Sequence, residues 1–334
     1  MQLSLSAVYV EGRTMRVHKT FLIFFLGLAS AVTLNAQQSP AAGSASQPEK
    51  PVEAIRTVPP AAPEHSVVSA TNDPKEIVRR SVETDHRTLE IARNYTSQRR
   101  ELIKHRRKNG DVKSTEIKTY DINFYYGERY ERLIAVDDKP LSETEQKKEE
   151  EKLNKFLSKY RDESESDRAK RLEKERKQRE EGRLFLRDVV NAYDFRLLGE
   201  EKVDGADSYI IEATPRAGFH PTQPHADMLK KIKGKLWIEK KDYNWVRVDA
   251  EAMDTISFGL FLFRIHPGSR FTFLKTLVNN EVWLLKRLDI DGGARIALFK
   301  NENVSQEEVI SNFRKFVTTV RILPDSKEVQ EPKQ

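Results

Sequence analysis

The segment Val246-Arg247-Val248-Asp249-Ala250-Glu251-Ala252 alternates apolar and charged side chains at every position. Residues 119–126, Thr-Tyr-Asp-Ile-Asn-Phe-Tyr-Tyr, show a similar alternation with larger apolar side chains. Because successive side chains of a strand point to opposite faces of a sheet, each segment is predicted to be a strand with one dry and one wet face. This pattern is typical of antiparallel sheets and decides the class of the fold.

Further strands are predicted along most of the chain, at residues 95–104, 130–136, 195–201, 208–214, 235–239, 270–277, 281–290, 294–300 and 309–320. Turn-forming residues stand between several of them: Asn109-Gly110, Asp204-Gly205, Asn279-Asn280 and Asp291-Gly292-Gly293. Roughly ten short strands joined by tight turns favour one antiparallel meander that is rolled to protect its edges. The sequence shows no strand-helix-strand alternation of the nucleotide-binding kind.

A helix is predicted to open the folded region at Asp73-Pro74-Lys75-Glu76. Asp73 suits the N-cap, Pro74 suits the first helical position, and Glu76 can complete a capping box. Four apolar residues then mark one face of a helix that ends near Arg93, namely Val78, Val82, Leu89 and Ala92.

Residues 142–187 form a charged insertion between predicted strands. Glu and Lys are strong helix formers, and opposite charges four residues apart support a helix in water. We therefore expect a long, mostly solvated helix or a helical hairpin, whose apolar tail packs back on the domain through Leu184, Phe185, Leu186, Val189 and Val190. A charge run of this kind is usually a solvated face, and a partner-docking arm is the alternative.

The first 36 residues resemble a secretory signal in composition. Arg16, His18 and Lys19 precede an apolar run at residues 21–29, and small or polar residues follow as far as Ala36. The run is shorter than the roughly 20 residues of a membrane-spanning helix, although an uncleaved N-terminal anchor is an alternative. Met15 offers a second start. The pattern predicts a periplasmic or secreted protein.

The rest of the chain divides by composition. Residues 37–72 are rich in Ala, Pro, Ser and Gln, and are predicted to be a disordered linker because they cannot bury enough apolar surface. Residues 73–323 are predicted to be the folded domain, which contains the charged insertion, and residues 324–334 a disordered tail.

Composition and motifs exclude several classes of function. The 334 residues include no cysteine, which excludes disulfides, thiol catalysis and the lipid-modified cysteine of a bacterial lipoprotein. The net charge of +6 comes from interleaved charges of both signs, so we expect no nucleic-acid partner, while weak peripheral contact with a membrane surface is compatible with it. No catalytic or phosphate-binding motif is present, and we expect no enzyme and no cofactor. A hydrolase with an unfamiliar site is the remaining alternative.

One loop contains potential metal ligands. His220, His225 and Asp227 lie close together in Gly218-Phe219-His220-Pro221-Thr222-Gln223-Pro224-His225-Ala226-Asp227. Two prolines and the irregular spacing favour a surface loop over a metal site, so we predict no bound metal.

The richest apolar stretch is Ile256-Ser257-Phe258-Gly259-Leu260-Phe261-Leu262-Phe263-Arg264-Ile265. It lacks strict alternation and should be covered on both sides, as a strand or as a short helix. A curved sheet must fill its concave side, because a void of about 300 Å³ would cost on the order of 7 kcal/mol. The filling is either a self-packed core or an apolar ligand, for which six aromatic residues are candidate wall positions: Phe258, Phe261, Phe263, Phe271, Phe273 and Trp283.

Three segments resemble the C-terminal half of the outer-membrane lipoprotein-sorting superfamily, the LolA/LolB-like fold. They are Gly234-Lys235-Leu236-Trp237-Ile238-Glu239, residues 242–248 and Glu281-Val282-Trp283-Leu284. The family pattern is a Gly-x-Leu-Trp-Ile strand, a turn, a second strand and a later Val-Trp-Leu-Pro strand, and Leu285 stands where the family has Pro. The resemblance covers residues 74–316 without the charged insertion. It implies a periplasmic half-barrel with a helical lid, whose concave face can accept acyl chains.

The sequence thus predicts an α+β protein with a single curved antiparallel sheet, an N-terminal helix and a long charged helical insertion. The expected function is to bind or carry an acyl chain, a lipoprotein or another apolar ligand in a half-barrel cavity. The alternative is a non-enzymatic envelope interaction or signalling module, which docks a protein partner on the charged helical arm.

Overall fold

Antiparallel pairing joins all neighbouring strands in the computed structural model, which describes residues 73–223, 225–258, 263–296 and 300–316. The strands are β1 (Tyr95–Arg106), β2 (Val112–Tyr125), β3 (Glu128–Val136), β4 (Lys139–Pro140), β5 (Tyr193–Val203), β6 (Ala206–Pro215), β7 (Ile232–Glu239), β8 (Trp245–Ala252), β9 (Ile256–Phe258), β10 (Phe263–Ile265), β11 (Arg270–Val278), β12 (Val282–Ile296) and β13 (Lys300–Lys315). The predicted signal segment, the linker and the tail at residues 324–334 lie outside the described residues.

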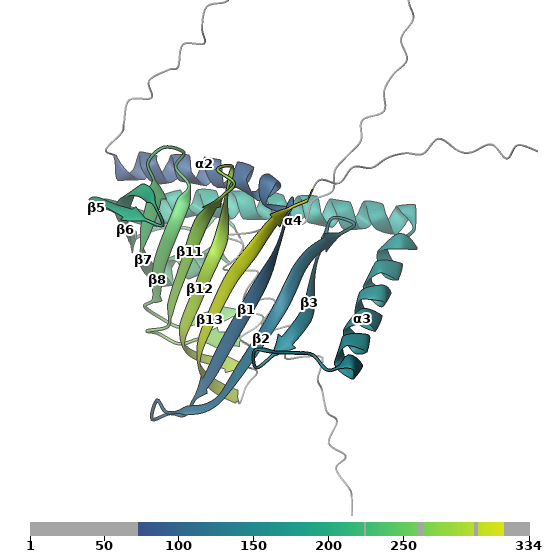
Figure 1. Ribbon diagram of the computed structural model, residues 1–334. Helices are drawn as coiled ribbons and strands as arrows, with labels where there is room; N and C mark the ends of the chain where they lie inside the picture. The colour runs from purple at the N-terminus through teal and green to yellow at the C-terminus, as the bar shows by residue number, and fades with distance from the viewer. Residues whose placement is uncertain (1–72, 224, 259–262, 297–299, 317–334) are drawn as a thin grey trace, which may run out of the picture.

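Within the ranges that the structure describes, these strands form one sheet of 13 strands, in the order β4-β3-β2-β1-β13-β12-β11-β8-β7-β6-β5. The short strand β10 pairs with β12, and β9 pairs with β10. The sheet is open, since β4 and β5 stand at opposite ends of this order, and it curves around the helices (Figure 1). The predicted α+β half-barrel is thereby confirmed.

In the described part of the chain, four helices accompany the sheet: α2 (Pro74–Ala92), α3 (Glu143–Arg161), α4 (Glu165–Ala192) and the 3-10 helix η1 (Ala226–Lys231). Helix α2 contacts α4 and also the strands β5, β7 and β12. The two helices run side by side across the strands, and α3 descends beside β3 (Figure 1). Within the described residues, no helix has the length and apolarity to cross a membrane.

The charged insertion is a hairpin of two helices, α3 and α4. Ser142 begins α3 with a capping box, in which its side chain accepts from the Glu145 N–H and the Glu145 carboxylate accepts from the Ser142 N–H. Ser164 caps α4 by accepting a hydrogen bond from the Asp167 N–H. The apolar tail of α4 packs on the domain as predicted, since Leu186 and Val189 are buried.

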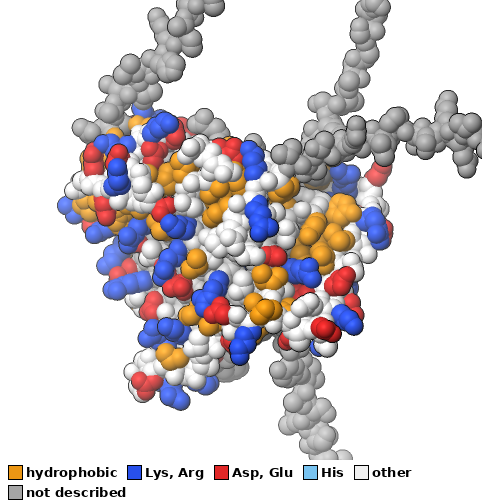
Figure 2. All heavy atoms as spheres, viewed as in Figure 1, with side chains coloured by type: hydrophobic (Ala, Val, Ile, Leu, Met, Phe, Trp, Pro, Cys, Tyr) orange, Lys and Arg blue, Asp and Glu red, His pale blue; other side chains and the backbone are white. Residues whose placement is uncertain are grey.

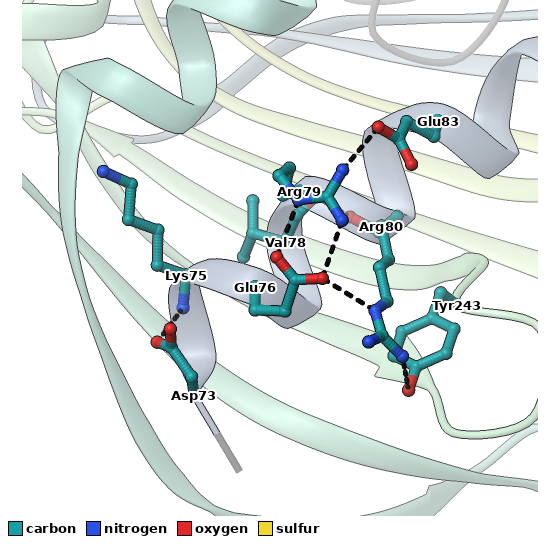
Figure 3. A network of polar contacts seen from close by, with 9 residues as sticks. Asp73, Lys75, Glu76, Val78, Arg79, Arg80, Glu83 and Tyr243 are labelled. Atoms are coloured by element: carbon teal, nitrogen blue, oxygen red, sulfur yellow. Dashed lines mark hydrogen bonds and ion pairs between the residues drawn. The ribbon is translucent and has the colours of Figure 1, made fainter. Parts of the chain in front are cut away.

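The start of α2 lies close to its predicted position. Asp73 is the N-cap and accepts from the Lys75 N–H at 3.0 Å. Glu76, however, does not complete the predicted capping box, because hydrogen bonds from Arg79 and Arg80 hold its carboxylate, and they lower its pKa to about 2 (Figure 3). Arg80 also donates to the Tyr243 hydroxyl at 3.2 Å and thereby ties α2 to the β7–β8 turn.

Two predicted hairpin turns are confirmed by their backbone. Asp204 and Gly205 have φ values of 49° and 87° between β5 and β6, and Asn279 and Asn280 have φ values of 51° and 54° between β11 and β12. Positive φ at both central residues is the conformation that Asn, Asp and Gly adopt most readily in tight hairpins.

The turn predicted at Asp291-Gly292-Gly293 is wrong, because β12 continues through it. The glycines allow close packing there instead. A Cβ atom added to Gly292 would lie 2.3 Å from the Ser269 hydroxyl oxygen, and one on Gly293 would lie 2.8 Å from the Asn303 side-chain oxygen. Neighbouring segments therefore occupy the space that larger side chains would need.

The apolar stretch at residues 256–265 is neither one strand nor a helix. Strands β9 and β10 pair with each other in antiparallel register, with Ile256 opposite Ile265. Both isoleucines are buried in the main hydrophobic cluster. Residues 259–262, which include Phe261, lie outside the described residues.

The main hydrophobic cluster lies between α2 and one face of the sheet, which we call the inner face. Ile77 and Val78 of α2 are fully buried in it. Trp245 of β8 is 1% exposed, stacks on Phe273 with ring centroids 6.4 Å apart, and donates its indole N–H to the Ser81 hydroxyl at 2.5 Å. This hydrogen bond fixes the rotation of α2 over the sheet.

We predict that Ser81→Ala lowers the free energy of unfolding by about 1–3 kcal/mol, because the buried indole N–H of Trp245 loses its acceptor. Urea denaturation followed by circular dichroism measures the change. Ser114→Ala, at an exposed position of β2, is the control and should stay within about 0.5 kcal/mol of the native protein. Equal stability of the two variants would contradict the assigned role of Ser81.

Candidate functional site

The inner face of the sheet has an apolar half under α2. Phe271 and Phe273 of β11 are 3% and 5% exposed, and both belong to the main cluster. Leu288 of β12 stands opposite Phe273, and Ile290 stands opposite Phe271. Cross-strand partners project from the same face, so these four side chains form one continuous apolar surface.

A charged half adjoins this apolar surface without a gap. In the pairing of β12 with β13, Leu288 stands opposite Glu308 and Ile290 stands opposite Gln306. The carboxylate and the amide therefore project from the same inner face as the two apolar side chains. The boundary between the apolar and the charged half runs between β12 and β13.

Arg99 of β1 is the centre of the charged half. Its guanidinium lies 2.8 Å from the Glu131 carboxylate of β3 and 3.4 Å from the Glu308 carboxylate of β13. It also lies 4.8 Å from the centre of the Tyr120 ring of β2. Arg99 thus links four neighbouring strands, and its side chain is only 7% exposed.

Three carboxylates belong to the network around Arg99, and Arg129 is a second cation in it because it pairs with Glu131. Gln306 donates to Glu101 at 3.0 Å and to Glu308 at 2.7 Å, which brings a third carboxylate to the network. Burial raises the pKa of Glu308 above its ordinary value, against the attraction of Arg99. The Nε atom of Arg99 is buried without a hydrogen-bond partner in the described part of the chain. A polar group that reached this network would therefore meet both a buried cation and buried carboxylates.

Trp283 belongs to a second apolar cluster and does not join Phe271 and Phe273. It packs with Val203, Trp237 and Val246. Trp237 stands between Leu236 and Ile238, which both face the main cluster, so its own side chain points to the opposite, outer face. Arg247 covers the Trp237 ring at 4.6 Å from its centroid.

The structure therefore brings together two of the six predicted wall residues, Phe271 and Phe273. Phe258 and Phe263 stand opposite each other in β9 and β10, and their side chains lie outside the description, as does Phe261. Sequence reasoning missed the Arg99 network. Arg99 and Glu131 lie in the predicted strands 95–104 and 130–136, Glu308 precedes the predicted strand 309–320, and no local pattern links the three residues. A usable signal is that β13 carries polar residues at the positions that pair with Leu288 and Ile290 of β12.

Hydrogen bonds to a buried carboxylate hold the loop that contains His220 and His225. Asp188 of α4 is 2% exposed and accepts from the Thr222 N–H at 2.8 Å, the Thr222 hydroxyl at 2.7 Å and the Gln223 N–H at 3.1 Å. Among the described residues, no three His, Asp or Glu side chains are grouped to hold a metal ion. Asp188 of α4 therefore ties this loop to the helix.

An aromatic patch lies where α3 meets the β2–β3 hairpin. Tyr130 and Phe156 have ring centroids 4.8 Å apart, Phe156 and Tyr160 are also 4.8 Å apart, and Tyr126 stacks on Tyr160 at 6.4 Å. Tyr125 contacts Tyr130 at 6.2 Å. Tyr126 is 48% exposed, and apolar side chains gather between β3 and α3 on the viewed face (Figure 2).

The chain is similar to several solved structures at low identity. A DUF1329 family protein from Desulfovibrio piger is 14% identical, with a TM-score of 0.29, and the match covers 74% of this chain and 95% of that one. A putative outer membrane lipoprotein-sorting protein domain from Vibrio parahaemolyticus is 13% identical, with a TM-score of 0.28 and coverage of 73% and 95%. A LolA superfamily protein from Nitrosomonas europaea is 11% identical, with a TM-score of 0.24 and coverage of 75% and 95%.

The second and third of these structures carry the name of the superfamily that the sequence motifs resemble. No protein-family model and no curated protein sequence matches the chain.

We predict that Arg99→Met lowers the free energy of unfolding by about 3–5 kcal/mol, because it leaves the buried Glu308 carboxylate without its cation, whereas Glu131 keeps its ion pair with Arg129. The double variant Arg99→Met/Glu308→Gln should recover part of this loss, since one uncompensated charge is removed. Urea denaturation at neutral pH measures both. A single variant as stable as the native protein would show that Arg99 does not compensate these charges.

Proposed function

We propose that the protein is a non-enzymatic binding or carrier protein of the bacterial cell envelope, whose inner face accepts an acyl chain or another apolar ligand. The observation that carries the proposal is the direct contact of the apolar half with the charged half between β12 and β13. An amphipathic molecule has the same division along its length. Its chain would lie on Phe271, Phe273 and Ile290, and its polar end would meet the Arg99 network.

The energetic basis is the transfer of apolar ligand surface from water, at about 25 cal/mol per Å². Helix α2 is the natural lid over this surface, because Ile77 and Val78 rest on the main cluster. A ligand gains access by displacing side chains of α2, and polar contacts that this movement would break include the hydrogen bonds Trp245–Ser81, Thr88–Asn244 and Arg80–Tyr243. The competing possibility is a core that α2 fills by itself.

Export is part of the proposal. It is supported by the cationic flank and the apolar run near the N-terminus.

A pair of matched substitutions tests binding on the inner face. Ala250 packs against the main cluster, whereas Ala206 packs against the second cluster with Trp237. We predict that Ala250→Trp weakens binding of a fluorescent fatty acid by about tenfold or more, a loss of about 1.4 kcal/mol, because the indole occupies space that the chain needs. Ala206→Trp should bind like the native protein. Thermal melts establish that both variants are folded, and equal affinities of the two variants would contradict the proposal.

The exposed aromatic patch supports a second candidate function, the docking of an envelope protein on the helical hairpin. Isolated exposed apolar residues are common, but Tyr126 begins a row of contacting aromatic rings that runs through α3 to Tyr130 of β3. We predict that Tyr126→Asp removes a cross-linked adduct that the native protein forms in cells. Val112→Asp, at a residue that is 47% exposed, is the matched control and should keep the adduct. Retention of the adduct in both variants would place the partner elsewhere.

A further inference from the structure

Arg171 joins the α3–α4 hairpin to the sheet through ion pairs. Arg171 of α4 lies 2.7 Å from the Glu163 carboxylate in the α3–α4 connection and 3.1 Å from the Glu175 carboxylate one turn further along α4. It also lies 3.1 Å from the Glu128 carboxylate at the start of β3. The two helices and the sheet thus meet at a single guanidinium.

The groups at this junction are largely removed from water. The side chains of Glu175, Glu163, Glu128 and Arg171 are 7%, 12%, 15% and 17% exposed. From α3, the Tyr160 ring covers Arg171 with 5.1 Å between the guanidinium carbon and the ring centre. The Lys159 ammonium lies over the same ring at 4.9 Å.

The junction has more negative than positive charge when every group is ionised. Three carboxylates face one guanidinium, which gives −3 + 1 = −2 among these four groups. Such a surplus in a buried site favours the neutral form of one carboxyl group. Burial, followed by the hydrogen bond and the repulsion from Glu128, raises the pKa of Glu175 to about 7.

We propose that the α3–α4 hairpin is a pH-responsive flap, held on β3 by one proton shared between Glu175 and Glu128 and loosened when that proton is lost. With the proton in place, a carboxyl–carboxylate hydrogen bond and Arg171 join α4 to β3. Without it, two buried carboxylates face each other and repel.

The direction of the effect follows from linkage. The pKa of Glu175 is higher in the docked state than the ordinary value of 4.5 that it has in water. The docked hairpin therefore binds a proton that the released hairpin does not hold between roughly pH 5 and pH 7. Docking is strongest below this window and weakens as the pH rises through it.

Release of the hairpin would separate α3 from β3. Phe156 of α3 would leave Tyr130 of β3, and Tyr160 would leave Tyr126 in the turn that follows β2. The flap thus couples the protonation of one carboxyl pair to the exposure of an aromatic surface on β3.

Hydrogen exchange of the full chain, read by mass spectrometry at pH 5.5 and pH 8.0 and corrected for the intrinsic rates, tests the flap. We expect the protection of residues 143–175 in the native protein to fall by about tenfold or more at the higher pH. Glu175→Gln keeps the hydrogen bond without a titrating group, so its protection should be high at both values. Glu173→Gln, on the exposed side of α4 where Glu173 pairs with Arg176, should behave like the native protein.

Glu128→Gln removes the other member of the pair and should also abolish the pH dependence, which keeps the test decisive if Glu175→Gln does not fold. Protection of the native hairpin that is equal at pH 5.5 and pH 8.0 would overturn the proposal. So would glutamine variants that lose protection at pH 8.0 as the native protein does.

Discussion

The register between β12 and β13 is the constraint on which the inner face depends. It sets Leu288 opposite Glu308 and Ile290 opposite Gln306, and so joins an apolar to a charged surface without an intervening loop. A slip of one residue would turn every side chain of β13 to the other face of the sheet. Glu308 would then leave Arg99, and the apolar surface would meet the side chains that now face outward.

Electrostatics has different roles in the two halves of the molecule. Under α2, buried hydrogen bonds from Trp245 to Ser81 and from Thr88 to Asn244 orient a helix over apolar side chains. Under β1 and β13, Arg99 takes the place of an apolar core and compensates carboxylates from two strands. Buried ion pairs of this kind contribute little net stability but are costly to break, which favours one arrangement of the strands.

The sequence predicted the parts of the fold that depend on local patterns. The period of two in β8 and the Asp204-Gly205 turn both have physical causes that lie within a few residues of each other. The same local reasoning failed at Gly292-Gly293, because the reason for these glycines is the close approach of Ser269 from the β10–β11 connection and of Asn303 from β13. Local reasoning also grouped Trp283 with Phe271. The alternation of side chains along β7 puts Trp237 on the outer face, and Trp283 packs in the same cluster as Trp237. The Arg99 network depends on the register of four strands, which no local pattern specifies.

The proposed function requires that the inner face holds an apolar molecule in the native envelope. Native mass spectrometry of the protein purified from envelope extracts, followed by extraction and analysis of bound lipid, tests this claim most directly. We expect a one-to-one adduct of the protein with a molecule that contains an acyl chain or a similar apolar group. A mass equal to that of the polypeptide alone, with no lipid in the extract, would contradict it and indicate that α2 and the sheet fill their core by themselves.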